Sequence, residues 1–204
     1  MIEVVEVKNR KQYREFFRFP FALYQNCTQW VPPITKEEEA VFDPIKNKVF
    51  NHAMARLFLA TKNGQTVGRV AAMINWVEVE ELKKTKVRFG WYDTIDDIEV
   101  SKKLIEAVQG VAIAEGMTYI EGPMGFSNMD KAGLLVKGYE HMNTMITWYH
   151  YPYQKEHLER LGLVKQSEWI EFKIDIYDAK DAPDKVKKYV DADYAGRDGQ
   201  APLR

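Results

Sequence analysis

The fold of this chain is decided by residues 86–123, which read KVRFGWYDTIDDIEVSKKLIEAVQGVAIAEGMTYIEGP. In residues 86–92, apolar side chains alternate with others, as they do in a half-buried β-strand. Residues 98–115 predict a helix, because these apolar side chains recur at helical spacing on one face: Leu104, Ile105, Val108, Val111 and Ala112. Residues 117–121 form the next predicted strand. Since only a helix separates the two strands, the stretch predicts a βαβ unit with parallel strands and a right-handed crossover.

A β-hairpin precedes this unit. Residues 56–61 and 66–75 are rich in β-forming side chains, and Asn63-Gly64 lies between them. The Asn-Gly pair suits the positive backbone angles of a tight hairpin turn. We therefore expect two antiparallel strands on either side of this turn.

The composition argues against several classes of protein. Lys and Arg number 29 against 30 Asp and Glu, so the net charge of −1 provides no field that attracts nucleic acid or an anionic membrane. The aromatic side chains are not interleaved with a basic patch, and we expect no nucleic-acid partner. The single cysteine, Cys27, excludes an internal disulfide and a cysteine-rich metal site. The histidines show no metal-ligand spacing, so no metal is expected.

The chain is also expected to have no membrane partner. Residues 1–8 alternate charged and apolar side chains and lack the continuous apolar core of a signal peptide. No apolar run approaches the roughly 20 residues needed to span a bilayer. We therefore expect a cytoplasmic protein.

Two stretches of the sequence carry a family resemblance: NGQTVGRVA at residues 63–71, and the helix and strand of residues 104–120. They are similar to the hairpin, and to the central helix and the strand after it, of the GNAT superfamily of acyl-CoA N-acyltransferases. Residues 158–163 are similar to its final lGF segment. A closer resemblance, over about residues 2–176, is to an uncharacterised bacterial GNAT-like group. It is carried by WVPP at 30–33, RFG at 88–90, GPMGF at 122–126, GLLVKGY at 133–139 and YHYPY at 149–153.

This resemblance implies an α/β (α+β) fold, with a mixed, mostly antiparallel sheet, a central βαβ unit and helices on both faces. It places one GNAT-like domain over residues 1–177, and residues 178–204 are then a C-terminal tail or the stub of a further module. The resemblance also implies acetyl-CoA or another acyl-CoA as co-substrate, and a small-molecule amine or a peptide as acceptor. A homo-oligomer is compatible with the sequence.

In the superfamily, a bulge separates two central parallel strands, and the pantetheine arm of coenzyme A enters there. The resemblance assigns Gly90, Trp91 and Tyr92 to this bulge and to cofactor binding. A glycine inside a strand has a second interpretation, which is that another backbone approaches it closely. Both interpretations of Gly90 remain open at this point.

The next helix of a GNAT enzyme usually starts with a glycine-rich turn whose N–H groups bind the pyrophosphate of coenzyme A. The corresponding N–H groups here belong to Ile98, Glu99 and Val100, but residues 93–99 contain four acids and no glycine. Acids in a first turn cap and stabilise a helix by roughly 1 kcal/mol, and the same carboxylates repel a pyrophosphate. The resemblance therefore implies a coenzyme A scaffold with an atypical pyrophosphate-binding turn.

The catalytic candidates are tyrosines. GNAT enzymes often use as general acid a tyrosine four residues before the glycine of the lGF segment, and here Leu158 takes that position. Tyr149, Tyr151 and Tyr153 are nearby substitutes for proton transfer. Tyrosines beside a proline also pack and bond to the backbone, which is the alternative.

The substrate-binding candidates are Ser127, Asn128 and Asp130, which follow the second strand of the βαβ unit. Ligands usually bind at the carboxyl ends of parallel strands, whereas turns and caps are the alternative role for these residue types. The resemblance implies an acyl-CoA-dependent N-acyltransferase in which the amine attacks directly. The alternative is a non-catalytic GNAT-fold domain that binds a ligand or a protein.

Overall fold

The computed structural model describes residues 1–127, 129–144 and 147–172, and in this part of the chain five strands form one sheet in the order β1–β2–β3–β4–β5. The strands are β1 (Ile2–Glu6), β2 (Ala53–Lys62), β3 (Gln65–Asn75), β4 (Lys86–Thr94) and β5 (Tyr119–Glu121). The helices are α1 (Arg10–Leu23), α2 (Thr35–Val41), the 3-10 helix η1 (Lys48–Asn51), α3 (Trp76–Glu80), α4 (Ile98–Ala114) and α5 (Pro152–Arg160). The chain divides after Glu168, and all of these elements belong to the first unit.

The pairing of the strands confirms the predicted fold class. β1, β2, β3 and β4 pair antiparallel with their neighbours, and β4 pairs parallel with β5 across α4. The predicted hairpin is β2–β3, with Asn63 and Gly64 at positive φ in its turn. The predicted βαβ unit is β4–α4–β5.

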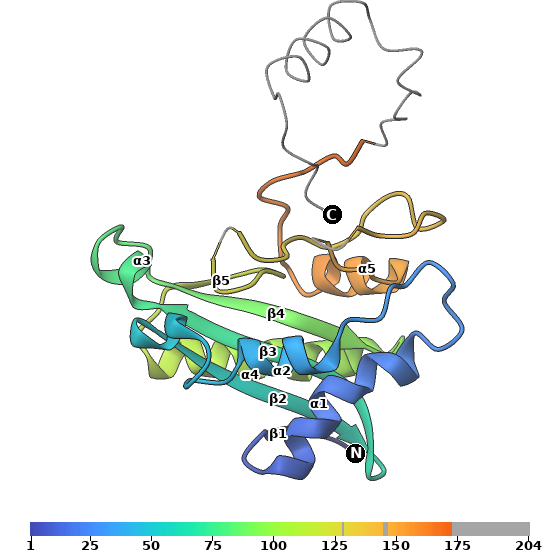
Figure 1. Cartoon of the computed structure of the whole chain (residues 1–204), viewed down its shortest axis with the longest axis horizontal. Helices are drawn as coiled ribbons and strands as arrows, with labels where there is room; N and C mark the ends of the chain where they lie inside the picture. Colours follow the sequence, from blue (N-terminus) through green and yellow to red (C-terminus); the bar gives the residue numbers. More distant parts are fainter. Residues whose placement is uncertain (128, 145–146, 173–204) are drawn as a thin grey trace, which may run out of the picture. The chain divides into compact units, whose positions relative to one another are not determined.

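Helices cover both faces of the sheet, as Figure 1 shows, with α1 and α2 on one side and α4 on the other. Along β3, Val70, Ala72 and Ile74 pack into the core beneath α4, while Ala71 and Met73 pack into the core beneath α1. Successive side chains of a strand point to opposite faces. A strand that is covered on both sides must therefore be apolar at odd-numbered and even-numbered positions alike. This explains the continuous apolar run in β3.

A β-bulge interrupts the pairing of β3 with β4. Arg69 lies opposite Asp93, and Ala71 lies opposite Gly90, so two steps along β3 match three along β4. The extra residue lies at Trp91–Tyr92, where Trp91 has a φ of 47°. Gly90 itself is in regular register. A bulge of this kind increases the twist and redirects the strand.

Gly90 is needed because a second backbone lies against it. A Cβ atom at this position would lie 2.3 Å from the carbonyl oxygen of Met124 and 3.2 Å from the ring of Trp148. The close-approach interpretation of this glycine is therefore confirmed. The chain after β5 crosses β4 at this point, and the Met124 N–H donates to the Phe89 oxygen at 2.8 Å.

We predict opposite effects of the same substitution at two glycines. Gly90→Ala should lower the free energy of unfolding by roughly 1–3 kcal/mol, because the added methyl group overlaps the Met124 backbone. Gly110→Ala should raise it by about 0.5–1 kcal/mol, because Gly110 lies inside α4 with no atom within 4 Å of an added Cβ. Urea denaturation of both variants measures this. Equal effects at the two positions would contradict the assigned contact.

Candidate functional site

Candidate residues from separate segments meet at the carboxyl end of β4. Trp91 and Tyr92 form the bulge there, and α4 begins four residues after Thr94, at Ile98. The Tyr153 hydroxyl, from the first turn of α5, donates to the Thr94 oxygen at 2.7 Å. This is the edge of a parallel strand pair at which ligands usually bind.

The pairing of β4 with β5 is short. It covers Lys86, Val87 and Arg88 of β4 only, opposite residues 119–121. The chain then crosses β4 at Met124, and in the described part no strand lies beside β4 on that side from Gly90 onward. The two parallel strands thus part just before the bulge.

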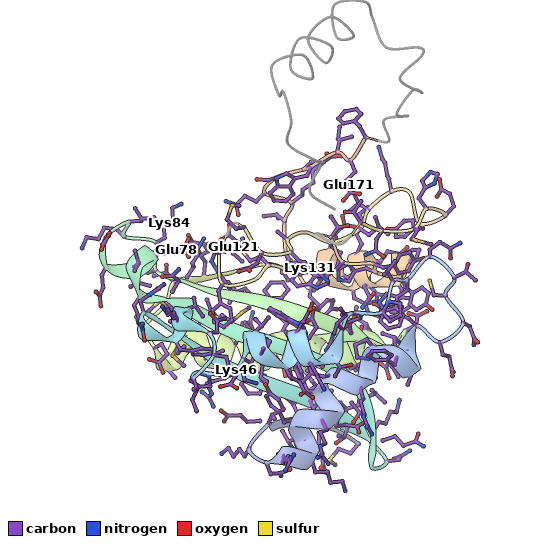
Figure 2. The ribbon with its side chains drawn as sticks, in the orientation of Figure 1. Lys46, Glu78, Lys84, Glu121, Lys131 and Glu171 are labelled. Carbon is purple, nitrogen blue, oxygen red and sulfur yellow. The ribbon has the colours of Figure 1, made fainter. Side chains whose placement is uncertain are left out.

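Charged residues hold the start of β4, at the opposite end from the bulge. Arg88 donates to both carboxylate oxygens of Glu78, at 2.8 and 2.5 Å, and to the Gly125 oxygen at 3.3 Å. Lys86 bonds Glu121 and lies 3.4 Å from Glu78. Burial raises the pKa of Glu78, but its hydrogen bonds with Arg88 and Lys86 and the charges of these two side chains together outweigh this and hold the pKa below its usual value. Figure 2 shows Glu78 and Glu121 close together at this end of the sheet, which they anchor.

The first turn of α4 is capped by the protein itself. Asp97 is the N-cap, and its side chain accepts from the Glu99 N–H at 3.1 Å. The Val100 N–H donates to the Asp97 backbone oxygen at 3.0 Å. The Lys62 ammonium, 2.9 Å from the Asp97 carboxylate, is the main cause of the lowered pKa of Asp97. Two of the three N–H groups assigned to pyrophosphate binding, those of Glu99 and Val100, are thus already occupied, and Ile98 is the third.

A chain of hydrogen bonds fastens α5 to the start of α4. The Tyr92 hydroxyl donates to Ser101 Oγ at 2.8 Å, and Ser101 Oγ lies 2.8 Å from His157 Nδ1. His157 Nε2 lies 3.3 Å from Asp96 Oδ1. Ser101 and His157 are buried, so these contacts fill the space beside the first turn of α4.

The three candidate tyrosines have different hydroxyl partners. The Tyr149 hydroxyl donates to the Tyr139 oxygen at 3.1 Å, and that of Tyr151 to the Leu23 oxygen at 3.5 Å, the longest of the three bonds. Only Tyr153 bonds to β4. Burial raises the pKa of all three phenols, so each keeps its proton at neutral pH.

A buried polar centre lies next to this end of β4, and sequence reasoning missed it. Asp93 accepts from Arg69 Nε at 2.7 Å and from the Tyr24 hydroxyl at 2.7 Å. Arg69 also donates to the Phe16 oxygen at 2.9 Å. All three polar side chains are buried. The available signal was Arg69 itself, a charged residue in the otherwise apolar run of β3.

A row of aromatic rings leads from this centre to the surface. Tyr24 stacks on Trp30 at 5.3 Å, and Trp30 meets Phe21 at 5.3 Å. In the other direction Tyr24 lies 5.0 Å from Tyr151, which stacks on Tyr153 at 5.6 Å. Phe21 is 37% exposed. We call these five rings the aromatic row. It joins exposed apolar surface to the polar centre.

The loop candidates bond mainly to one another. The Asp130 carboxylate accepts from the Ser127 N–H at 2.8 Å and lies 3.2 Å from its hydroxyl. Ser127 Oγ accepts in turn from the Met129 N–H at 3.1 Å. Asn128 lies outside the described residues. The structure does not bring Ser127 or Asp130 into contact with the tyrosines or the bulge through any of these bonds.

Residues 1–127, 129–144 and 147–172 contain no cluster of three or more His, Cys, Asp or Glu side chains that could hold a metal. The same ranges contain no helix that is long and apolar enough to cross a membrane.

The amino-acid sequence is similar to those of two curated relatives. The chain is 30% identical over 157 residues to Protein YghO of Escherichia coli (strain K12). This match covers 77% of this chain and 40% of that protein. It is 27% identical over 190 residues to the Bacterial ceramide synthase of Caulobacter vibrioides (strain NA1000 / CB15N), covering 93% of this chain and 49% of that protein. The chain thus spans half or less of the length of each relative. No family model matches it.

A solved structure shares the fold. It is AAC(6')-Iy in complex with a bisubstrate analogue, CoA-S-monomethyl-acetylneamine, with a TM-score of 0.51 and 12% sequence identity. The match covers 86% of this chain and 99% of that one. At this identity the likeness concerns the arrangement of helices and strands alone.

We predict that the folded protein loses stability in mild acid because of His150. This side chain is buried, and its pKa is lowered to about 4: burial is the main cause, the charge of Asp93 opposes it, and the charge of Arg69 adds to it. The unfolded chain binds the proton near the ordinary pKa of 6.5, so this stability is complete above that pH and is lost as the pH falls toward 4. The loss should reach about 3 kcal/mol.

Urea denaturation between pH 7 and pH 4 measures this effect. His150→Gln should flatten the decline, whereas the same substitution at the exposed His141 should leave it unchanged. A His150→Gln protein with the full wild-type decline would show that other groups cause it.

Proposed function

Since the chain has the GNAT fold, we propose that it takes part in the acyl-CoA-dependent transfer of an acyl group to an amine. The observation that carries the proposal is the bulge at Trp91 and Tyr92, beside parallel strands that part after Arg88. This geometry supports the entry of the acyl-pantetheine arm along the side of β4 that no described strand pairs with from Gly90 onward. The shared fold of an enzyme solved with a coenzyme A bisubstrate analogue supports the same co-substrate.

For the acceptor we propose an amphipathic, long-chain amine. One relative is named for the synthesis of ceramide, which is the amide of a fatty acyl group and a long-chain amine. The aromatic row supports such an acceptor, because its exposed end at Phe21 and Trp30 offers apolar surface and its inner end meets Asp93 through Tyr24. A smaller amine or a peptide amine is the competing acceptor.

The chemistry we propose needs no covalent enzyme intermediate. The amine lone pair attacks the thioester carbonyl, the C–N bond forms, and the C–S bond breaks as the thiolate leaves. Tyr153 is suited to protonate that thiolate, because its hydroxyl lies at the end of β4 and keeps its proton at neutral pH. The proton lost by the amine nitrogen restores the phenol through solvent, so the products are an amide and the free thiol.

A second candidate function is favoured by the start of α4. The Asp97 cap and the Ser101–His157 contact lie at the helix start that the family resemblance assigns to pyrophosphate binding. A GNAT-fold domain that binds a ligand or protein without catalysis accounts for this directly. Under the first proposal, these contacts must yield or the pyrophosphate must bind elsewhere.

The domain organisation is also a proposal. We place one domain over residues 1–177 and a separate C-terminal segment over residues 178–204. The division of the chain after Glu168 supports a boundary in this region. Self-association of the chain remains compatible with the proposal.

Calorimetric titration with acetyl-CoA and with a long-chain acyl-CoA tests the proposed function. We expect micromolar binding, and amide product by mass spectrometry when a long-chain amine is added. Neamine serves as the competing acceptor. Absence of binding at millimolar acyl-CoA would reject the acyl transfer and leave the binding-domain candidate.

We predict that Tyr153→Phe lowers kcat by roughly 100-fold with little change in acyl-CoA affinity, because it removes the proton donor and keeps the ring. Tyr13→Phe is a matched control, since the Tyr13 hydroxyl also donates to a backbone oxygen at 2.7 Å, that of Glu39, and lies outside the site. Steady-state release of free thiol measures both. Equal losses in the two variants would remove Tyr153 from the chemistry.

A further inference from the structure

Gln154 is a buried amide in the first turn of α5. Its side chain is fully buried, and its Oε1 accepts from the Tyr151 N–H at 2.8 Å, which caps the helix. The Tyr24 hydroxyl also lies 3.2 Å from this oxygen. Because a backbone N–H can donate only to the oxygen, the Tyr151 contact assigns the two ends of the amide. The nitrogen, Nε2, is therefore the end that points elsewhere.

This nitrogen has no partner. Among the buried side-chain nitrogen and oxygen atoms that the structure describes, Nε2 of Gln154 is the one without a hydrogen bond. A buried donor left unpaired costs free energy, and each such group in a folded protein calls for an explanation. One explanation is an oxygen atom of a bound molecule that accepts a hydrogen bond from Nε2. The free-energy cost of the unpaired donor is then removed in the complex only.

The position of this amide matches the proposed chemistry. Tyr153, the residue before it, bonds the end of β4 at Thr94. Tyr24, which touches its oxygen, also bonds Asp93 at 2.7 Å. The amide thus belongs to the residue after the proposed proton donor, and its oxygen touches the polar centre through Tyr24. Tyr24, which touches the amide, and Asp93, to which Tyr24 donates, already have partners.

We propose that Gln154 Nε2 is an oxyanion donor, holding the carbonyl oxygen of the acyl group as the amine attacks. This inference rests on the proposed function and deepens it by assigning a catalytic residue. In the step, the amine forms the C–N bond and the carbonyl electrons move onto oxygen, where the amide N–H binds the negative charge. When the C–S bond breaks, those electrons re-form the carbonyl. A donor aimed at a developing oxyanion is among the largest contributors to such reactions.

A carbonyl reaches this nitrogen only if an enclosing side chain moves. Of Tyr151 and Tyr153, which precede Gln154 in the chain, Tyr151 has the weaker hydroxyl bond, because its contact with the Leu23 oxygen is 3.5 Å, against 2.7 Å for Tyr153 and Thr94. Tyr151 is also partly exposed. Entry past Tyr151 leaves the bond between Tyr153 and Thr94 in place.

Gln154→Met tests the assignment, because methionine keeps the length of the side chain and removes the donor. We expect kcat to fall by about 100-fold while the acyl-CoA dissociation constant changes less than about threefold. Infrared spectra of acyl-CoA labelled with ¹³C at the carbonyl supply a readout independent of turnover. The C=O stretch of the bound thioester should lie at lower wavenumber in the wild type than in the variant.

Two further variants separate catalysis from folding. Gln109→Met makes the same change at an exposed position of α4 and should alter neither readout. Gln154→Glu keeps the acceptor for the Tyr151 N–H and can donate only while protonated. Its activity relative to wild type should therefore fall as the pH rises and the carboxyl group loses its proton. Asp93 and Arg69 are the charged side chains of the adjoining polar centre.

Each outcome decides the proposal. If acyl-CoA binds and turns over, but Gln154→Met keeps kcat within threefold and leaves the carbonyl band unshifted, Nε2 holds only a structural water and the oxyanion role is rejected. In that case the proposed function stands. If the wild type binds no acyl-CoA, the proposed function fails and the oxyanion role fails with it.

Discussion

The ion pair between Arg69 and Asp93 is the interaction on which the carboxyl end of β4 depends. The two residues face each other across β3 and β4, with side chains 7% and 9% exposed and 2.7 Å between their charged atoms. Burying two charges costs desolvation, and only a close, well-bonded pair offsets it. The pair therefore specifies one register of β3 against β4 at Arg69 and Asp93, whereas the pairing of Ala71 with Gly90 specifies a register that differs by one residue. The extra residue between them, at Trp91–Tyr92, is the bulge.

The same pair organises the elements around it. Tyr24 brings the end of α1 to Asp93, and the Phe16 oxygen ties the middle of α1 to Arg69. His150 is buried within the field of both charges, which is why its pKa depends on them. A single charged contact between neighbouring strands thus positions α1, the bulge and the segment that leads into α5.

The two faces of this strand end differ in how completely their polar groups are paired. Toward α4, the hydroxyl groups of Tyr92 and Ser101 and the ring of His157 form a continuous set of bonds. Such a set stabilises the contact of α5 with α4. Toward α1, Gln154 retains an unpaired donor inside an otherwise bonded cluster. Paired networks are typical of structural contacts, whereas an unpaired buried donor is typical of a place that receives another group.

The sequence by itself determined the local elements. Asn63-Gly64 specified the hairpin, the helical spacing from Leu104 to Ala112 specified α4, and the acids before Glu99 specified a capped helix start, because each of these signals acts between residues close in the chain. Gly90 in β4 also indicated, as one of its two interpretations, that another backbone approaches the strand closely, although the sequence did not show which segment does so.

Only the tertiary structure decided the site. Tyr24 meets Asp93 across 69 positions and Gln154 across 130, and no periodicity or turn signal carries information over that separation. The segment 164–176 gives the opposite case, since it is rich in β-forming residues, yet residues 164–172 contain no strand. A strand forms only where a second strand satisfies its N–H and C=O groups. Local chemistry therefore specified which elements could form, and the pairing of distant side chains and backbones decided where they met.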